Sequence, residues 1–330
     1  MYKFFLFVFA NLFWQQVSSQ KIEILSQESK ESFRGLSVVN DSIIWISGTN
    51  GTVGRSIDAG QSFQWIQVKG FEQTDFRDID AFDDHTAIIM GIAEPAYILK
   101  TTDAGLNWNV VYENQMQGMF LDALVFFDNQ NGMVIGDPIN GKVFLAQTHN
   151  GGDSWTQMKT SSFPDLVDGE ACFASSGSNI VMLSKKKFAY ITGGIQSNLF
   201  IGKKKIVLPV LMGKETTGAN AIGIKDAQTW MIVGGDFMEP DLISNNLCIT
   251  YNAGKSFIKP IQPPHGYRSC VEFMDDQLWI SCGINGVDIS NDNGLHWQLI
   301  SAEGFHVCKK AKQGNTVFLV GKGKIGVYRE

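Results

Sequence analysis

Short apolar runs recur along the chain in pairs, and a polar turn separates the two members of each pair. The first members are Phe33 to Leu36, Phe76 to Ile79, Phe120 to Ala123, Ala171 to Ala174, Gly218 to Ala221, Tyr267 to Cys270 and Phe305 to Cys308. The second members close on glycine, at Gly48, Gly91, Gly136, Gly193, Gly234, Gly283 and Gly321. Two apolar runs around a polar turn are typical of a β-hairpin, so the pattern predicts antiparallel strands throughout.

The spacing of these pairs is that of a propeller blade. Between Gly48 and Gly321 the closing glycines recur about every 45 residues, which fits a four-stranded blade. Third strands follow the pairs, as in Tyr97 to Thr101 and Val143 to Thr148. We therefore predict an all-β fold, a seven-bladed β-propeller of four-stranded antiparallel blades, with six or eight blades as the alternatives.

A turn motif, Ser/Thr-x-Asp/Asn-x-Gly-x-x-aromatic, occurs five times at the same spacing. Its acidic or amide positions are Asp58, Asp103, Asn150, Asn252 and Asp292. We expect this side chain to accept backbone N–H groups of its own turn, the glycine to supply a positive φ and the aromatic residue to pin the turn. The motif resembles the Asp-box, or BNR repeat, of sialidases, sortilin-type receptors and photosystem II assembly-factor-like propellers, which implies a structural role at the blade periphery.

The chain ends predict how the ring closes. The seventh repeat stops after its third strand, and the segment Lys21 to Leu25 precedes the first repeat. Pairing the two would complete the last blade and remove exposed sheet edges. We expect one domain at 20–330, with blades at about 33–68, 76–112, 120–158, 171–209, 218–260, 267–300 and 305–330 plus 21–25.

Residues 1–19 have the pattern of a signal peptide, with Lys3 ahead of an apolar run and small residues near Ser19. This predicts export, to the periplasm or outside the cell, with an uncleaved leader acting as an anchor as the alternative. No later stretch has the roughly 20 apolar residues of a membrane-spanning helix. The formal net charge of −6 argues against a nucleic-acid partner. We expect a monomer.

Neither the cysteines nor the histidines have the spacing of a metal or redox site. The five cysteines are Cys172, Cys248, Cys270, Cys282 and Cys308, without a CxxC pair. Buried free thiols and a pairing of Cys270 with Cys282 or Cys308 both remain open. His149 and His296 fall in the turn motifs and His85 in a hairpin turn. The sequence therefore predicts no metal ion and no cofactor.

One end of the propeller is expected to carry the function. Loops entering the first strands and loops between second and third strands share the face opposite the turn motifs. The candidate binding residues on that face are Arg34, Arg77, Glu94, Asp137, Glu170, Asp236, His265, Arg268 and His306. Arginine suits a carboxylate or phosphate ligand, whereas the alternative is a lattice of ion pairs among these residues.

Nearly the whole mature chain resembles exported propellers of the photosystem II stability/assembly-factor-like group. Segments that carry the resemblance include Phe76 to Ile79, Met90 to Pro95, Gly169 to Gly177, Pro264 to Cys270 and Gly304 to Cys308. The resemblance favours a non-enzymatic scaffold or assembly factor that binds a protein or peptide partner. The alternative is a glycan-binding or sialidase-like glycoside hydrolase for acidic sugars, with Arg34, Arg77 and Arg268 clustered around a carboxylate. No catalytic residue can be assigned from spacing.

Overall fold

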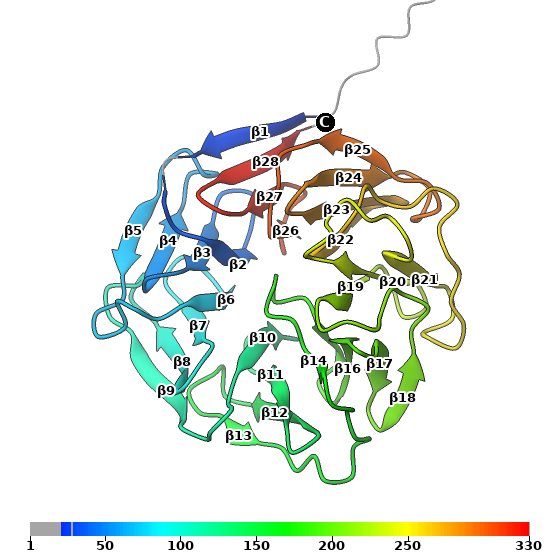
Figure 1. Ribbon diagram of the computed structural model, residues 1–330. Helices are drawn as coiled ribbons and strands as arrows, with labels where there is room; N and C mark the ends of the chain where they lie inside the picture. The colour runs from blue at the N-terminus through cyan, green and yellow to red at the C-terminus, as the bar shows by residue number, and fades with distance from the viewer. Residues whose placement is uncertain (1–20, 28, 330) are drawn as a thin grey trace, which may run out of the picture.

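The computed structural model describes residues 21–27 and 29–329, so the expected signal peptide at 1–19 lies outside the described residues. Figure 1 shows the strands arranged as a ring of sheets around a common axis. Within the described ranges, no helix is long and apolar enough to cross a membrane.

Four of the sheets have four strands in chain order. Their strands are β2 (Phe33–Val38), β3 (Ile44–Gly48), β4 (Thr52–Ser56) and β5 (Gln64–Gln67); β6 (Phe76–Ala81), β7 (Ala87–Gly91), β8 (Ala96–Thr101) and β9 (Asn109–Asn114); β10 (Leu121–Phe126), β11 (Gly132–Ile139), β12 (Lys142–Thr148) and β13 (Thr156–Gln157); and β22 (Cys270–Asp275), β23 (Leu278–Gly283), β24 (Gly286–Ser290) and β25 (Gln298–Ser301). All neighbouring strands are antiparallel, as predicted.

An eight-stranded sheet consists of two blade-like groups. One group is β14 (Glu170–Ala171), β15 (Ile180–Ser184), β16 (Lys187–Gly194), β17 (Asn198–Ile201) and β18 (Lys204–Val207), and the other is β19 (Thr217–Ile224), β20 (Trp230–Asp236) and β21 (Leu247–Thr250). A single residue pair, Gly193 with Gly218, joins β16 to β19. A bridge between Ile249 and Ile258 stands where a fourth strand of the second group would lie. The 28 strands of the described residues thus fit seven blades.

The last sheet closes the ring as predicted. Its strand order is β1 (Lys21–Ser26), β28 (Ile325–Arg329), β27 (Val317–Val320) and β26 (Val307–Lys310), so the two ends of the described chain lie side by side (Figure 1). β1 pairs antiparallel with β28, with Ile22 opposite Tyr328 and Ile24 opposite Gly326. The pairing covers an edge that β28 would otherwise expose.

The hydrophobic core lies between successive sheets. On β7, Ile88 and Met90 pack toward the third sheet, whereas Ile89 packs with Trp45 of the first sheet. Both faces of a middle strand are therefore covered, and β7 is buried along its whole length. Alternation of polar and apolar residues is consequently lost in these strands, which explains why the sequence shows continuous apolar runs there.

The five turn motifs adopt one hydrogen-bond pattern. In the second sheet, Asp103 Oδ1 accepts the N–H of Asn107 at 2.9 Å, and Thr101 Oγ1 accepts the N–H of Gly105 at 3.0 Å. Thr101 also donates its hydroxyl to Asp103 Oδ1 at 2.8 Å. The same bonds recur around Asp58, Asn150, Asn252 and Asp292. The turn is thus a side-chain-capped loop, as the sequence implied.

Each turn also contacts the preceding blade. A Cβ atom on Gly105, whose φ is +84°, would lie 2.6 Å from Ile66 Cδ1 of the first sheet. The ring of Trp108 packs edge-on against Trp45 of that sheet, with centroids 6.4 Å apart. Glycine is therefore required here for both conformation and close approach, and the motif joins neighbouring blades as well as closing its own hairpin.

All five cysteines are buried free thiols. Cys270 and Cys282 lie directly opposite each other on β22 and β23 and are not joined. Of the alternatives that the sequence left open, the structure has free thiols.

Replacing Thr101 with Val should destabilise the fold. The substitution keeps the shape of the side chain but leaves the buried N–H of Gly105 without its acceptor, which costs about 1–3 kcal/mol. Thr101→Ser is the matched control, because Ser56 and Ser290 fill the same position in other repeats. Urea denaturation measures both variants. Equal stability of the two would contradict the proposed role of the hydroxyl.

Candidate functional site

A pocket of about 400 Å³ lies where the first residues of the inner strands meet. Inner strands of a propeller run in the same direction, so the residues that begin them gather at one end of the axis. The lining residues are Arg34, Arg77, Phe120, Cys172, Phe173, Ala174, Ser175, Asn220, Phe237, Tyr267, Ser269, Ile284 and His306. We call this cavity the mouth pocket. Its lining contains two arginines and no carboxylate.

The segment Phe173 to Asn179 crosses the axis and forms the floor of the mouth pocket. Ser176 Oγ donates to the carbonyl of Ser269 at 2.7 Å, and Lys309 Nζ donates to Ser178 Oγ at 3.1 Å. Figure 1 shows the chain between β14 and β15 reaching toward the centre of the ring. We call this segment the plug. It separates the mouth pocket from a second cavity of about 230 Å³, which Gly177, Ser178 and Lys309 line.

The plug corrects one detail of the sequence prediction. Residues 171–174 were expected to begin the first strand of the fourth repeat, but β14 ends at Ala171 and β15 starts at Ile180. The run Ser175 to Asn179 contains serine, glycine and asparagine, and Gly177 has a φ of +64°. Such clusters break strands, so this run was the available signal for an irregular segment.

Arg34 is a cation with unused hydrogen-bond donors. Its Nη1 donates to the carbonyl of Ser175 at 3.3 Å, and among the described residues no carboxylate forms an ion pair with it. Burial, followed by the nearby charge of Arg77, lowers the pKa of Arg34 from its usual value of 12.5. Because the ordinary pKa of arginine is so high, Arg34 stays protonated at neutral pH. The mouth pocket therefore holds a positive charge without an ion-pair partner among the described residues, although the more distant Asp75 carboxylate acts on it.

Arg77 lies beside Arg34 but is partly engaged. Its Nε forms an ion pair with Asp75 Oδ2 at 2.7 Å, and its guanidinium stacks over the ring of Phe120 at 5.7 Å from the centroid. Arg77 adds to the positive potential of the mouth pocket, whereas its orientation is already set by protein groups.

His306 and Tyr267 are neutral polar groups in the lining. Burial, together with the charges of Arg34 and Arg77, lowers the pKa of His306 to about 3. Its Nε2 shares a hydrogen bond with Ser32 Oγ at 3.2 Å, and its buried Nδ1 has no partner in the described residues. Burial raises the pKa of Tyr267 to about 12, and its hydroxyl donates to Asn220 Oδ1 at 2.8 Å. His306 Nδ1 is thus a buried nitrogen whose hydrogen-bonding capacity is unused.

Aromatic and aliphatic side chains form the remaining wall. Phe173 of the plug packs edge-on against Phe237, with centroids 6.1 Å apart, and Phe237 packs in turn against Tyr267. Phe237 and Ile284 are both exposed in part at the rim. The mouth pocket therefore combines an apolar wall with the positive charges of Arg34 and Arg77, and apolar walls with a few polar groups are common in ligand sites.

Arg268, expected at the same site, lies elsewhere. Its side chain is completely buried, its Nε donates to Asp288 Oδ2 at 2.7 Å and its Nη1 donates to Asn285 Oδ1 at 2.7 Å. Further bonds reach the carbonyls of Tyr267 and His265. Every part of the guanidinium is used to hold the loop before β22. The three arginines therefore do not converge.

The other candidate residues also lie outside the lining of the mouth pocket. Glu170 is buried and accepts bonds from Thr192, Asn198 and Lys205. The remaining residues make loop contacts: Asp236 pairs with Lys214, Glu94 accepts the N–H of Gly118, Asp137 accepts the N–H of Cys172, and the backbone N–H of His265 donates to Asp288. Part of this face thus consists of ion pairs, as in the alternative to a ligand site. Of the nine candidate residues, Arg34, Arg77 and His306 line the mouth pocket.

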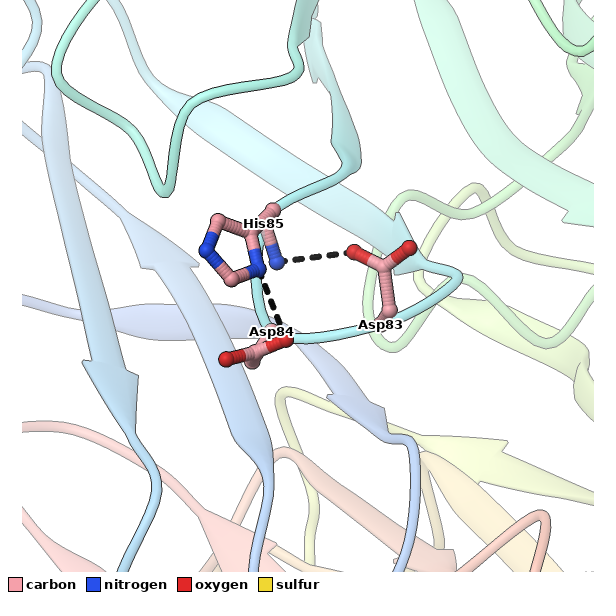
Figure 2. A group of neighbouring side chains, drawn as sticks. All are labelled: Asp83, Asp84 and His85. Atoms are coloured by element: carbon pink, nitrogen blue, oxygen red, sulfur yellow. Dashed lines mark hydrogen bonds and ion pairs between the residues drawn. The ribbon is translucent and has the colours of Figure 1, made fainter.

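Two groups in the described residues bring three potential metal ligands together, although the sequence predicted no metal site. One is the exposed turn of Asp83, Asp84 and His85, drawn in Figure 2. Asp83 Oδ1 accepts the N–H of His85, and Asp84 Oδ1 bonds to His85 Nδ1 at 2.8 Å. Hydrogen bonds within the turn account for these side chains. The second group is Asp122, Asp137 and Cys172, beside the mouth pocket.

No family model and no curated protein matches the chain. Solved structures do match it. A structure described as YCF48 bound to D1 peptide is 14% identical, with a TM-score of 0.64 over 96% of each chain. YCF48 from Cyanidioschyzon merolae is 17% identical, with a TM-score of 0.60 over 94% of this chain and 99% of that chain. The WD40 propeller domain of Doa1 is 13% identical, with a TM-score of 0.62 over 94% and 97%.

These identities are low, so the likeness shows the fold. It confirms the predicted class of an all-β propeller and, at the level of the fold, the predicted resemblance to assembly-factor-like propellers. Shared folds host unrelated functions, and the function has to be argued from the mouth pocket itself.

Replacing Arg268 with Met should strongly destabilise the protein. The change leaves the Asp288 carboxylate buried without its partner, which costs about 3–5 kcal/mol. The double variant with Asp288→Leu removes the uncompensated charge and should recover part of this loss. Chemical denaturation of the single and double variants measures the difference. If the double variant loses as much free energy of unfolding as the two single variants lose together, Arg268 and Asp288 do not act as a buried pair.

His306 should make the stability depend on pH. In the folded protein its pKa is about 3, against an ordinary value of 6.5, so below about pH 6.5 the unfolded chain binds a proton that the folded chain does not. Stability is therefore lost as the pH falls. Relative to His306→Asn, the wild type should lose about 2 kcal/mol between about pH 6.5 and pH 5.

Urea denaturation across this pH range gives the comparison. The matched control is His265→Asn, which removes an imidazole from an exposed position of the same face. If the difference in stability between the wild type and His306→Asn stays the same across this pH range, the imidazole of His306 is not buried in its neutral form.

Proposed function

We propose that this chain is a non-enzymatic propeller that binds a protein or peptide partner through the mouth pocket, with a role in assembly or as a scaffold. One observation carries the proposal: among the described residues, no carboxylate lines the pocket of Arg34, and its one hydrogen bond goes to a backbone carbonyl. A partly buried cation without an ion-pair partner favours an anionic ligand.

The shape and lining of the mouth pocket indicate what the ligand contains. A volume of about 400 Å³ suits a chain terminus or one or two side chains. The Arg34 guanidinium can bind a carboxylate with two parallel hydrogen bonds. Phe173 and Phe237 offer apolar contacts. A carboxylate next to an apolar side chain, as at a peptide C-terminus, matches this arrangement.

The comparisons support a peptide as the class of ligand. YCF48, whose fold this chain shares, has been solved with a bound D1 peptide. The sialidase-like alternative placed Arg34, Arg77 and Arg268 around one carboxylate, and Arg268 is buried against Asp288 instead. Export to the periplasm or the cell exterior, inferred from residues 1–19, is part of the proposal and would place the partner in that compartment.

An array of short peptides, each made with a free C-terminal carboxylate and again as the amide, tests the proposal. We expect a subset to bind the wild type in the free-acid form. Arg34→Gln should weaken their binding about tenfold or more, because a charge-assisted hydrogen bond contributes about 1.5–3 kcal/mol. Fluorescence anisotropy measures the affinities.

The control variant is Arg329→Gln, which removes the same charge from an exposed side chain paired with Glu23. It should bind as the wild type does. Two outcomes would overturn the proposal: no peptide binds in either form, or Arg34→Gln and Arg329→Gln bind with equal affinity.

A further inference from the structure

Three potential metal ligands meet beside the mouth pocket, and Cys172 is the one that lines it. Asp122 lies on β10, Asp137 on β11, and Cys172 directly after β14. The carboxylate oxygens of the two aspartates and the Cys172 sulfur come within 4.8 Å of one another. Asp122 sits where the register between β10 and β11 shifts, so the ladder does not pair it with a residue of β11. Residues 15 and 35 positions apart along the chain are thereby brought to one point.

The Asp122 carboxylate is an independent sign that a ligand is bound here. Its side chain is completely buried, and neither of its oxygens has a hydrogen-bond partner in the described part of the chain. Leaving a buried carboxylate unpaired is costly, so such groups are normally paired, hydrogen-bonded or bound to a metal. Burial, followed by the nearby charge of Asp137, raises the pKa of Asp122, while the charge of Arg77 opposes the increase.

The cluster of Asp122, Asp137 and Cys172 differs from the turn drawn in Figure 2 in how its carboxylates are bonded. There, hydrogen bonds within the turn account for Asp83 and Asp84, and the three residues lie at an exposed hairpin. Asp137 uses one oxygen to accept the N–H of Cys172 at 2.9 Å, which fixes the carboxylate beside the thiol and leaves its other oxygen available. Both Asp122 oxygens are buried and unpaired, whereas the remaining ligand atoms of the exposed turn can be hydrated.

We propose that Asp122, Asp137 and Cys172 bind a divalent cation and that Zn²⁺ is the ion that fits them best. Zinc accepts both thiolate and carboxylate ligands in a four-coordinate site. Calcium and magnesium prefer six or more oxygen ligands, and copper(I) prefers sulfur. Three protein ligands leave a fourth position. Since Cys172 also lines the mouth pocket, that position can be filled from the pocket by water or by a ligand group.

The charges of the site are compatible with this ion. Two carboxylates and a thiolate carry three negative charges, the zinc ion supplies two positive ones, and Arg77 lies close enough to act on Asp122. Binding requires the Cys172 proton and any proton on the aspartates to be released to solvent. Arg34 does not participate, so the inference stands independently of the proposed peptide binding.

Isothermal titration of the full chain with zinc chloride, after dialysis against a chelator, tests the site. The wild type should bind one zinc ion per chain at this site. Cys172→Ser and Asp122→Asn should each weaken binding about tenfold or more, because each removes a direct ligand. Zinc should also raise the thermal midpoint of the wild type and not that of Cys172→Ser.

Cys248→Ser is the matched control, because Cys248 is a buried thiol on another strand and belongs to neither ligand group. It should bind zinc as the wild type does, and so should Arg34→Gln. Cobalt(II) gives a second readout. A thiolate-to-cobalt absorption band should appear in the wild type and in Cys248→Ser and be absent from Cys172→Ser. This comparison does not use Asp122→Asn, so it tests the site even when that variant does not fold.

Two results would overturn the site. One is a wild type that binds no zinc, and the other is zinc or cobalt binding that Cys172→Ser leaves unchanged. Either result would rule out a zinc ion held by Cys172 together with the two aspartates.

Discussion

The pairing of β1 with β28 is the interaction on which the rest of the structure depends. It joins residues about 300 positions apart and turns a row of sheets into a closed ring. Closure forces the inner strands to converge, so the residues that begin them meet at one end. Arg34 and Arg77 lie on β2 and β6, Tyr267 and His306 lie just before β22 and β26, and the four share a pocket for this reason. The turn motifs at the periphery support the same ring by holding each blade against the one before it.

Convergence creates a second requirement, because the space along the axis has to be filled. The plug meets it with small polar side chains that bond to strands on several sides, including Ser269 and Lys309. It also presents Phe173 and the Ser175 carbonyl to the mouth pocket. One irregular segment thus completes the core, supplies part of the ligand wall and orients Arg34. A regular strand in the fourth repeat would provide none of these contacts.

The pairing of buried charged residues explains which candidate residues can bind a ligand. Most charged residues of this face have partners: Arg268 with Asp288, Glu170 with Lys205, and Asp236 with Lys214. These pairs position loops. Arg34 alone among the candidate arginines has no carboxylate partner within the described ranges, and the Asp122 carboxylate has no hydrogen-bond partner there. The two groups point to ligands of opposite charge at neighbouring places.

Local patterns predicted the fold well, because turns and strands are encoded over a few residues. The capped turns around Asp103 and its equivalents set the register of the repeats, and the position of Lys21 to Leu25 predicted the closure. The site was predicted only in part. Arg268 is removed from the pocket by Asp288, which lies on another strand, and the cluster of Asp122, Asp137 and Cys172 forms only when β10, β11 and β14 meet. Contacts of this kind depend on the folded arrangement and leave no mark in local spacing.

A crystal structure of the chain with a bound carboxylate-ended peptide tests the central claim most directly. The account predicts the peptide carboxylate at about 2.7–2.9 Å from the Arg34 guanidinium, with a neighbouring apolar side chain against Phe173 and Phe237. A peptide bound at the opposite cavity or along an outer strand, with Arg34 still bonded only to the Ser175 carbonyl, would contradict it.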